Sequence, residues 1–529
     1  MPAELYYNGD ILTMENEVYT EAVLVENGVI AAAGPKEALL RTCPQAKLCD
    51  LKGCTMLPAF IDPHSHISAL SSTMGIVSLS GAKSIDEISQ RLREFEQKNP
   101  LKDGEWVIGF GYDHNDLKER RHPTRFDLDK AIPNHPVLIS HASGHMGAAN
   151  TQALKEGGVT RDCENPQGGV IGRGEDGEPD GYLEETAFVG FSKHMPASGA
   201  PTLDSMDKAQ KVYLQNGITT VQDGLTREAD WALLKAMAQA GRFLVDVVSY
   251  PDLKNSKNLM RENPEYQGNY LGRLRIGGYK LILDGSPQGK TAWLSAPYEN
   301  EPDGYRGYPV YSDEEALELM KIPLKEQKQL LCHCNGDAAS EQFIDCYEAA
   351  MRETGETKDL RPVMIHAQTV RLSQLDRMKP IHMIPSFFVA HVYYWGDVHL
   401  INLGERRASR ISPVKSAARR RIPFTLHQDT PVIAPNMLET IWCAVNRVTK
   451  RGEALGKEER ADPLTALKGV TIHAAHQYFE EDIKGSIKAG KLADLVILDK
   501  NPLKVEPMEI RDIRVLSTIK DGECVYRRE

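Results

Sequence analysis

The strongest constraint on the fold is a repeated alternation of short apolar runs with longer helical patterns. Runs of this kind are typical of buried strands, and eight of them begin near residues 55, 218, 244, 277, 329, 362, 383 and 422. Between several of them the apolar residues recur with helical spacing, as in the stretch 313–327. Eight strands alternating with helices predict an α/β protein built on a parallel, TIM-like (β/α)8 barrel rather than an open sheet.

Two parts of the chain do not fit that alternation. About 150 residues separate the first and second strand candidates, which is too long for a strand-to-helix connection, so we expect an inserted subdomain over about 70–210. Residues 1–56 and 477–529 contain short β-rich runs, with Asn-Gly pairs as hairpin signals. Because chain termini often lie close together, we expect both ends to form one small β-sandwich domain beside a barrel domain of residues 57–476.

The composition excludes several classes of function. The net charge of −11 gives no basic footprint for nucleic acid. No stretch reaches the roughly 18 consecutive apolar residues that span a bilayer, and the N-terminus lacks a signal-peptide pattern. The odd number of cysteines, 9, is typical of reduced thiols. We therefore expect a cytoplasmic enzyme with a small-molecule substrate, no membrane or nucleic-acid partner, and a homodimer as the commonest assembly.

Histidine and aspartate residues stand at the ends of several strand candidates. His64 and His66 follow the first candidate, and alternation along an extended segment places both on one face, where they can bind one metal ion. His333 and His366 end the fifth and sixth candidates, and Asp429 ends the eighth. A single strand-end histidine is more often a core residue. The combination predicts a metal site, because the carboxyl ends of barrel strands meet at one rim.

Lys280 is unusual because it lies inside the apolar run of the fourth candidate strand. Burying an ammonium group beside divalent metal is costly. Reaction with carbon dioxide would convert the amine into a carbamate, an anion able to bridge two metal ions. Asp429 would then be a general base for metal-held water. These residues predict a hydrolase with two divalent ions, zinc first and manganese or iron as alternatives.

Longer motifs around these residues resemble the amidohydrolase superfamily, and more narrowly its branch of N-substituted formamide deformylase and YtcJ-like proteins. The resemblance covers nearly the whole chain. The branch motifs are "GYD" at 111–113, "HPTRFDLDKAIPNHPVLISHASGHMGAANTQAL" at 122–154, "GGVIGRGEDGEPDGYLEE" at 168–185, "YKLILDGSPQGKTAWLSAPY" at 279–298, "HCNGDAA" at 333–339, "MIHAQTV" at 364–370 and "QDTPV" at 428–432. The closing "GSIKAGKLADLVILDKNP" at 485–502 is common across the superfamily.

This resemblance implies specific roles for the candidate residues. His64 and His66 would bind the more buried metal near Asp429, and carbamylated Lys280 would bridge to a second metal. His333 and His366 would hold that second ion. Residues expected near the substrate are His145, Asp113, Asp284 and Trp293.

One departure from the branch pattern affects the substrate side of the site. Where "G-S-D" commonly precedes the eighth-strand motif, this chain has "LHQD", which puts His427 near Asp429. His427 either hydrogen-bonds the substrate or packs against the barrel wall.

Two other functions stay open at this point. Aminohydrolases of heterocycles with a mononuclear metal site commonly carry a Glu three residues after the fifth-strand histidine. Here Gly336 occupies that position and Asp337 follows, which together with Lys280 favours amide hydrolysis. A non-catalytic binding barrel would bind no metal. We expect a metal-held hydroxide to cleave a non-peptide carbon–nitrogen bond, while the sequence does not identify the leaving group.

Overall fold

The chain folds into two compact units. The computed structural model describes residues 3–99, 101–114, 116–141, 146–167, 169–192, 202–299 and 301–529. The first unit combines Met1–Ser68 with Asp207–Glu529, and the second is the single stretch Ala69–Met206. The second unit therefore interrupts the first between its N-terminal strands and the rest of its chain.

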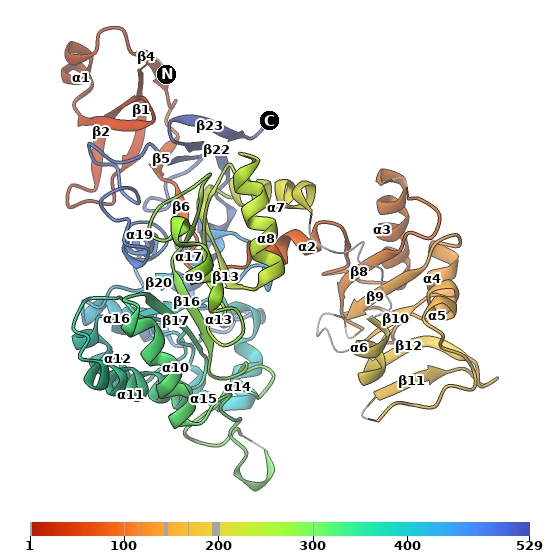
Figure 1. The fold of residues 1–529 in the computed structure, drawn as a ribbon. Coiled ribbons are helices and arrows are strands. Elements are labelled where there is room, and N and C mark those ends of the chain that lie inside the picture. Colours follow the sequence, from red (N-terminus) through yellow and green to blue (C-terminus); the bar gives the residue numbers. More distant parts are fainter. Residues whose placement is uncertain are drawn as a thin grey trace. The chain divides into compact units, whose positions relative to one another are not determined.

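Parallel strands form the centre of the first unit (Figure 1). One sheet pairs β6, β13, β14 and β15, and another pairs β16, β17, β18, β19 and β20. The bounds are β6 Phe60–Ile61, β13 Ile218–Thr226, β14 Asp246–Pro251, β15 Leu274–Ile276, β16 Gly278–Ile282, β17 Gln329–Cys334, β18 Val363–His366, β19 Ile384–Phe387 and β20 Thr425–Leu426. Only Gly277 separates β15 from β16, and Asp252 bridges to Lys280, so the two sheets are consecutive. This strand order and parallel direction agree with the α/β fold predicted from the sequence.

Helices follow most of these strands. They are α7 Leu203–Gln215, α8 Glu228–Gln239, α9 Asn258–Glu262, α10 Asp313–Lys325, α11 Asp337–Thr354, α12 Leu372–Met378, α13 His391–Tyr394, α14 Gly396–Leu403, α15 Glu405–Ala408, α16 Val414–Arg419, α17 Met437–Asn446, α18 Pro463–Gly469 and α19 Ile472–Gln477. Helix α10 begins with a capping box, in which Ser312 accepts the Glu315 N–H and Glu315 accepts the Ser312 N–H. Helix α11 ends at Gly355, whose φ of 71° is the left-handed conformation that glycine adopts readily.

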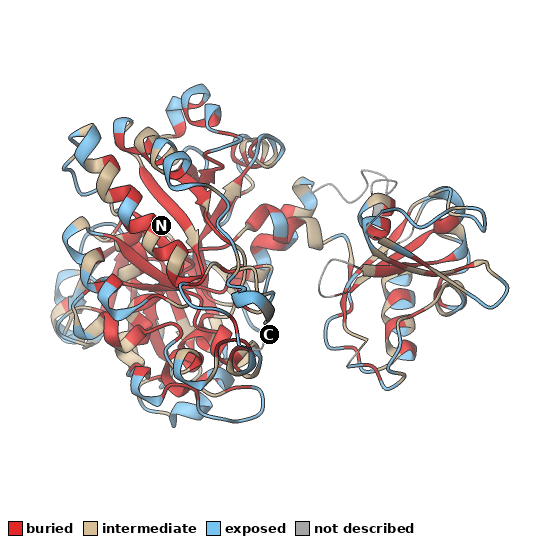
Figure 2. Ribbon diagram, turned by 90° about the horizontal axis from the view of Figure 1, so that it is seen from below, coloured by how far each residue is buried: buried red, intermediate tan, exposed pale blue. Residues whose placement is uncertain are grey.

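One buried cluster of the first unit lies between the parallel strands and α19. Ala474, Ala475 and Tyr478 share one buried cluster with strand residues such as Val248 and Leu331. Figure 2 shows the parallel strands almost entirely buried, with many exposed residues on the surrounding helices and loops. Truncating a core leucine to alanine costs about 2–5 kcal/mol, so this packing fixes the strand ends that carry the polar residues.

Both chain termini build one further sheet, which confirms the predicted terminal β-structure. Its order is β23-β22-β21-β5-β1-β2-β3, with β4 paired to β1. The bounds are β1 Glu4–Leu12, β2 Tyr19–Glu26, β3 Val29–Gly34, β4 Lys47–Asp50, β5 Thr55–Pro58, β21 Leu495–Leu498, β22 Val515–Lys520 and β23 Glu523–Arg527. Helix α1 Lys36–Thr42 contacts this sheet.

Two details of this sheet differ from the sequence prediction. The apolar run 55–62 is not one barrel strand, because β5 joins the terminal sheet and only β6 joins the parallel sheet. Asn27-Gly28 is the expected hairpin turn between β2 and β3. Asn8-Gly9 instead lies within β1, where the pairing register shifts between Tyr7 and Ile11. Asn-Gly supplies the positive φ that both a tight turn and a bulge require, so the pair alone does not distinguish them.

The second unit is built on one mixed sheet with the order β11-β12-β10-β9-β8-β7. The bounds are β7 Val77–Ser78, β8 Val107–Tyr112, β9 Val137–His141, β10 Met146–Ala149, β11 Gly169–Arg173 and β12 Pro179–Glu185, with helices α3 Ile85–Lys98, α4 Arg125–Ala131, α5 Thr151–Glu156 and α6 Thr186–Ser192. Helix α2 Ile67–Thr73 begins in the first unit and continues into the second. One buried cluster joins α3 and α4 to β8 and β9, and another joins α5 and α6 to β9 and β12. Among the described residues of both units, no helix is long and apolar enough to cross a membrane.

Candidate metal centre

Residues from the first and last parallel strands meet at one point of the first unit. Nε2 of His64 lies 3.3 Å from Oδ1 of Asp429, and Nε2 of His66 lies 3.2 Å from the same oxygen. His64 is buried, with 1% of its side chain exposed, whereas His66 is 26% exposed. Asp429 follows β20 in a left-handed conformation with a φ of 55°. The structure thus brings these three predicted residues together.

Lys280 reaches the same point from β16. Its Nζ lies 3.2 Å from Nε2 of His64, and the residue is almost completely buried. Burial lowers the pKa of the Lys280 ammonium group to about 8. About a tenth of this side chain is therefore a neutral amine at pH 7, far more than for an ordinary lysine.

His366, at the end of β18, also faces this group of residues. Its ring centroid lies 5.6 Å from that of His64, and one ligand atom from each of His64, His366 and Asp429 falls within 4.8 Å of the others. His366 has a φ of 72°, a conformation rare for a residue with a side chain. We call His64, His66, Lys280, His366 and Asp429 the barrel centre.

His333 lies beside the barrel centre but is engaged elsewhere. Its ring centroid is 4.5 Å from that of His366. Its Nδ1 lies 3.2 Å from Asp284, and its Nε2 lies 3.3 Å from the Asn335 amide nitrogen. The close group of ligand atoms therefore does not include His333.

A hydrogen-bond partner behind His64 sets its orientation, and sequence reasoning missed it. Nδ1 of His64 lies 2.6 Å from Oε1 of Gln222 on β13. The Gln222 amide nitrogen donates to the Pro63 carbonyl (2.8 Å) and to the Tyr478 hydroxyl (3.0 Å), so Oε1 must accept from His64. The lone pair of His64 therefore lies on Nε2, which faces the barrel centre. Metal-binding histidines commonly have such a partner.

His427 has the same relation to His366. Its Nε2 lies 3.1 Å from Nδ1 of His366, and its Nδ1 lies 2.9 Å from the Ser386 hydroxyl. His427 is completely buried. Both ring nitrogens of His427 therefore contact other side chains of the protein. This favours a packing role against the barrel wall over a hydrogen bond to the substrate.

The remaining predicted residues lie in different places. Asp284 accepts N–H groups from Trp293 (3.0 Å), Asn335 (2.9 Å) and Gly336 (2.7 Å), so its carboxylate holds two loops together. Trp293 takes part in this arrangement through its backbone. Asp113 belongs to the second unit. His145 lies outside the described residues.

The electrostatics of the barrel centre suit metal binding. Burial holds the pKa values of His64 and His366 well below their usual range and lowers that of His427 to about 3. Burial alone would raise the pKa of Asp429, but the adjacent imidazoles hold it well below its usual range. Neutral imidazoles and an ionised carboxylate are the forms that bind metal.

The donor set fits a divalent cation. Oδ1 of Asp429 is buried and has no hydrogen-bond partner within the described part of the chain, although two imidazole nitrogens surround it. An unsatisfied buried carboxylate oxygen is costly unless a cation completes its environment. Imidazole nitrogen and carboxylate oxygen are ligands that zinc accepts.

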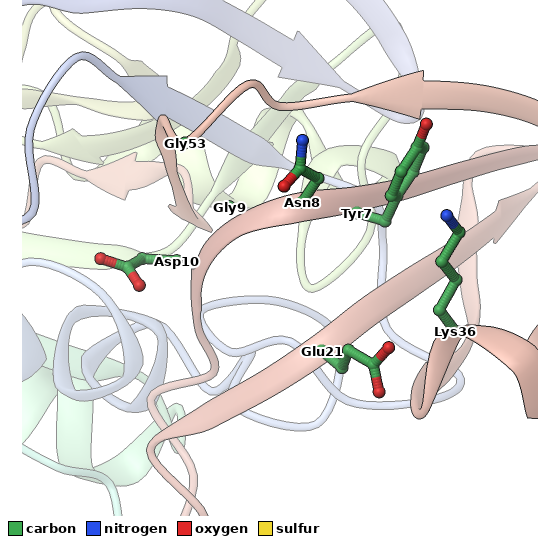
Figure 3. Close-up of a pocket in the computed structure, with 7 residues that line it drawn as sticks. All are labelled: Tyr7, Asn8, Gly9, Asp10, Glu21, Lys36 and Gly53. Carbon is green, nitrogen blue, oxygen red and sulfur yellow. The ribbon is translucent and has the colours of Figure 1, made fainter.

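A groove of about 500 Å³ lies in a different place, on the terminal sheet (Figure 3). Two of its charged side chains have partners: Asp10 pairs with Lys504 at 2.7 Å, and Lys36 lies 3.5 Å from the centre of the Tyr7 ring. No histidine or cysteine lines it. This groove therefore does not offer the metal chemistry of the barrel centre.

Comparison with known proteins places this geometry in context. Residues 47–526 match the model of the family described as "Amidohydrolase family". N-substituted formamide deformylase of Arthrobacter pascens is 29% identical, covering 96% of this chain and 95% of the relative. The Bacillus subtilis amidohydrolase YtcJ is 28% identical, covering 99% of each chain. An uncharacterized metal-dependent hydrolase from Pyrococcus furiosus has a TM-score of 0.76 at 25% identity, covering 95% of this chain and 100% of that one.

The family match spans most of the chain and agrees with the fold and with the ligand types at the barrel centre. The chain therefore belongs to the amidohydrolase family of metal-dependent hydrolases.

Proposed function

We propose that this protein hydrolyses a carbon–nitrogen bond other than a peptide bond in a small molecule, with divalent metal held at the barrel centre. The observation that carries the proposal is the convergence of His64, His366 and Asp429 beside the buried amine of Lys280. A relative named as an N-substituted formamide deformylase supports the choice of an amide-type bond.

The side chains of the barrel centre would divide the work between them. His64 and His66 would bind metal through Nε2, and Gln222 would keep the His64 lone pair directed at the site. Divalent ions bound there would lower the pKa of water and polarise the substrate carbonyl. Asp429, ionised at neutral pH, would accept a proton on its carboxylate and deliver it to the leaving nitrogen.

Lys280 would complete the site as a carbamate. Its neutral amine would attack carbon dioxide, forming a nitrogen–carbon bond and releasing one proton. The carbamate would give the barrel centre an anionic ligand in place of the ammonium form of Lys280. His366 and His333 would be available for a second metal. In this structure His333 contacts Asp284 through Nδ1 and Asn335 through Nε2. We expect Nε2 to lose its contact with Asn335 when it binds metal.

The carbamate can be tested without an activity assay. Protein loaded with zinc in 13C-bicarbonate should give a carbamate resonance that is absent from Lys280→Met. Lys290→Met, which removes another lysine of the same unit, should keep it. A bare lysine at full metal occupancy would contradict the carbamate and leave a scheme with one metal.

Deamination of a heterocycle is the second candidate reaction. Asp337 follows Gly336, the usual proton-shuttle position, in the sequence; it accepts the Ser295 N–H at 2.9 Å and pairs with Arg371 at 3.0 Å. Because these contacts engage both of its oxygens, Asp337 is poorly placed to shuttle protons. The arrangement favours amide hydrolysis over deamination.

A hydrolysis screen tests the proposed function directly. Zinc- or manganese-loaded protein should be assayed against N-formyl amines, N-acyl amino acids, cyclic amides and aminated heterocycles. We expect turnover in one of the amide classes and none after His64→Ala. Turnover of aminated heterocycles alone would favour deamination, and activity that survives His64→Ala would place the site elsewhere.

A further inference from the structure

The second unit carries its own group of imidazoles at the ends of two neighbouring strands. Strands β8 and β9 are parallel, and Tyr112 at the end of β8 pairs with His141 at the end of β9. Asp113 and His114 follow β8 directly. Because parallel strands end at one edge of a sheet, three side chains with metal-binding atoms meet there.

The spacing of these atoms suits a small metal ion. Nε2 of His141 lies 3.4 Å from Oδ1 of Asp113, and Nδ1 of His114 lies 3.8 Å from the same oxygen. One ligand atom from each residue lies within 4.8 Å of the others. A tetrahedral ion with ligands at about 2.0–2.1 Å separates them by about 3.3 Å, so only small side-chain movements would be needed.

The surroundings of the group also point to a ligand. Nδ1 of His114 is a buried atom with no hydrogen-bond partner in the described ranges of the chain. The centroid of the His122 ring lies 4.1 Å from that of the His114 ring. Nδ1 of His122 lies 3.0 Å from the Tyr112 hydroxyl, and this contact holds the His122 ring beside the group. Orphaned buried nitrogen atoms are uncommon in folded proteins, and a cation would satisfy this one.

We propose that Asp113, His114 and His141, the second-unit cluster, bind a divalent ion of the zinc class. Imidazole and carboxylate ligands select zinc, cobalt or nickel over magnesium and calcium. The ion would join the loop after β8 to the end of β9 and so stabilise the second unit. This site is separate from the proposed hydrolytic reaction and does not depend on it.

Cobalt binding to a full-length variant with a disabled barrel centre tests the proposal. In His64→Ala/Asp429→Asn we expect about one cobalt ion per chain, with the visible absorption of a tetrahedral complex. Adding His114→Ala/His141→Ala should weaken cobalt binding by more than about 100-fold. Loss of a hydrogen-bond partner behind a ligand costs only about 10–100-fold, and these changes remove two ligands themselves. His135→Ala, in the same unit but bonded to the Glu105 carbonyl, should leave it unchanged.

Two further measurements keep the test decisive. Asp113→Asn preserves side-chain volume, so weaker cobalt binding in a variant with an unchanged circular dichroism spectrum would reflect a lost ligand. Zinc should slow amide hydrogen exchange at the ends of β8 and β9 in the barrel-disabled chain. A folded barrel-disabled chain that binds no cobalt, or one that binds it equally after His114→Ala/His141→Ala, would overturn the proposal whatever the outcome at the barrel centre.

Discussion

The barrel centre and the second-unit cluster use the same residue types at strand ends but differ in how these are held. The barrel centre draws on the ends of β6, β18 and β20 and on β16, and its side-chain exposure ranges from 1% for His64 through 13% for Asp429 to 26% for His66. The second-unit cluster draws on two adjacent strands, and exposes 11% of the His141 side chain, 29% of the His114 side chain and 41% of the Asp113 side chain.

The supporting hydrogen bonds differ as well. At the barrel centre, Gln222 holds His64 and the His427–Ser386 pair holds His366. Near the second-unit cluster, Nδ1 of His122 lies 3.0 Å from the Tyr112 hydroxyl, and Nε2 of His141 lies 3.4 Å from Oδ1 of Asp113. Ligands held by their own hydrogen-bond partners suit catalysis, whereas a more exposed cluster on one strand pair suits a structural ion. Residue type alone does not separate the two.

The largest expected effect is the loss of the barrel centre itself. His64→Ala and His66→Ala should each abolish metal loading and turnover, because each removes an imidazole that faces Asp429. His382→Ala, which changes an exposed histidine of the same unit, should do neither. Metal analysis and an activity assay check this, and full activity with retained metal in either variant would contradict the site.

Chelation should separate the two proposed metal sites by rate. Buried ligands slow the exchange of a metal ion, so EDTA should remove the second-unit metal before the barrel metal. The expected order is a fast phase lost in His114→Ala/His141→Ala and a slow phase lost in His64→Ala. A single phase that only His64→Ala removes would break the comparison.

Changes behind His64 should have an intermediate effect. Gln222→Leu removes the acceptor at Nδ1 and should weaken metal binding by about 10–100-fold. Gly224→Ala should act similarly, since its added Cβ would lie 2.6 Å from Cε1 of His64. Gly75→Ala meets no atom within 4 Å and is the matched control. Metal titration measures all three, and unchanged affinity in Gln222→Leu would mean that tautomer control is unimportant here.

The smallest expected effect is on the pH dependence of stability, and it comes from a buried histidine that is not one of the proposed metal ligands. His399 is completely buried, and burial lowers its pKa to about 4. The unfolded chain binds its proton near pH 6.5, so this group contributes stability above that pH, which is lost as the pH falls toward 4. Between pH 7 and pH 5 the loss should be about 2 kcal/mol. Thermal unfolding of His399→Leu should show a shallower pH dependence than the parent protein and His382→Ala, and an equal slope would contradict this.

Strand periodicity and barrel topology predicted that strand-end residues would lie at one rim, and His64, His366 and Asp429 do lie together beside Lys280. His64, His366 and Asp429 end strands that the chain order makes parallel, and Lys280 is conspicuous within an apolar run. Their positions follow from the side-chain period of two and from the shared rim.

The supporting residues could not be predicted in this way. Gln222 and Ser386 are ordinary polar residues within strands, and their roles depend on the register between neighbouring strands and on side-chain rotamers. The division of the run 55–62 between β5 and β6 was equally hidden, because both sheets bury apolar side chains. His333 shows the reverse case, since its expected position is right but Asp284 and Asn335 engage its nitrogens.

Anomalous diffraction from zinc-loaded crystals of the active protein is the most direct test of the central claim. We predict a strong zinc peak between His64, His66 and Asp429, with density extending from Nζ of Lys280 toward a second peak near His366. Fully active crystals with no anomalous peak at His64, His66 and Asp429 would contradict the barrel centre as the site of hydrolysis.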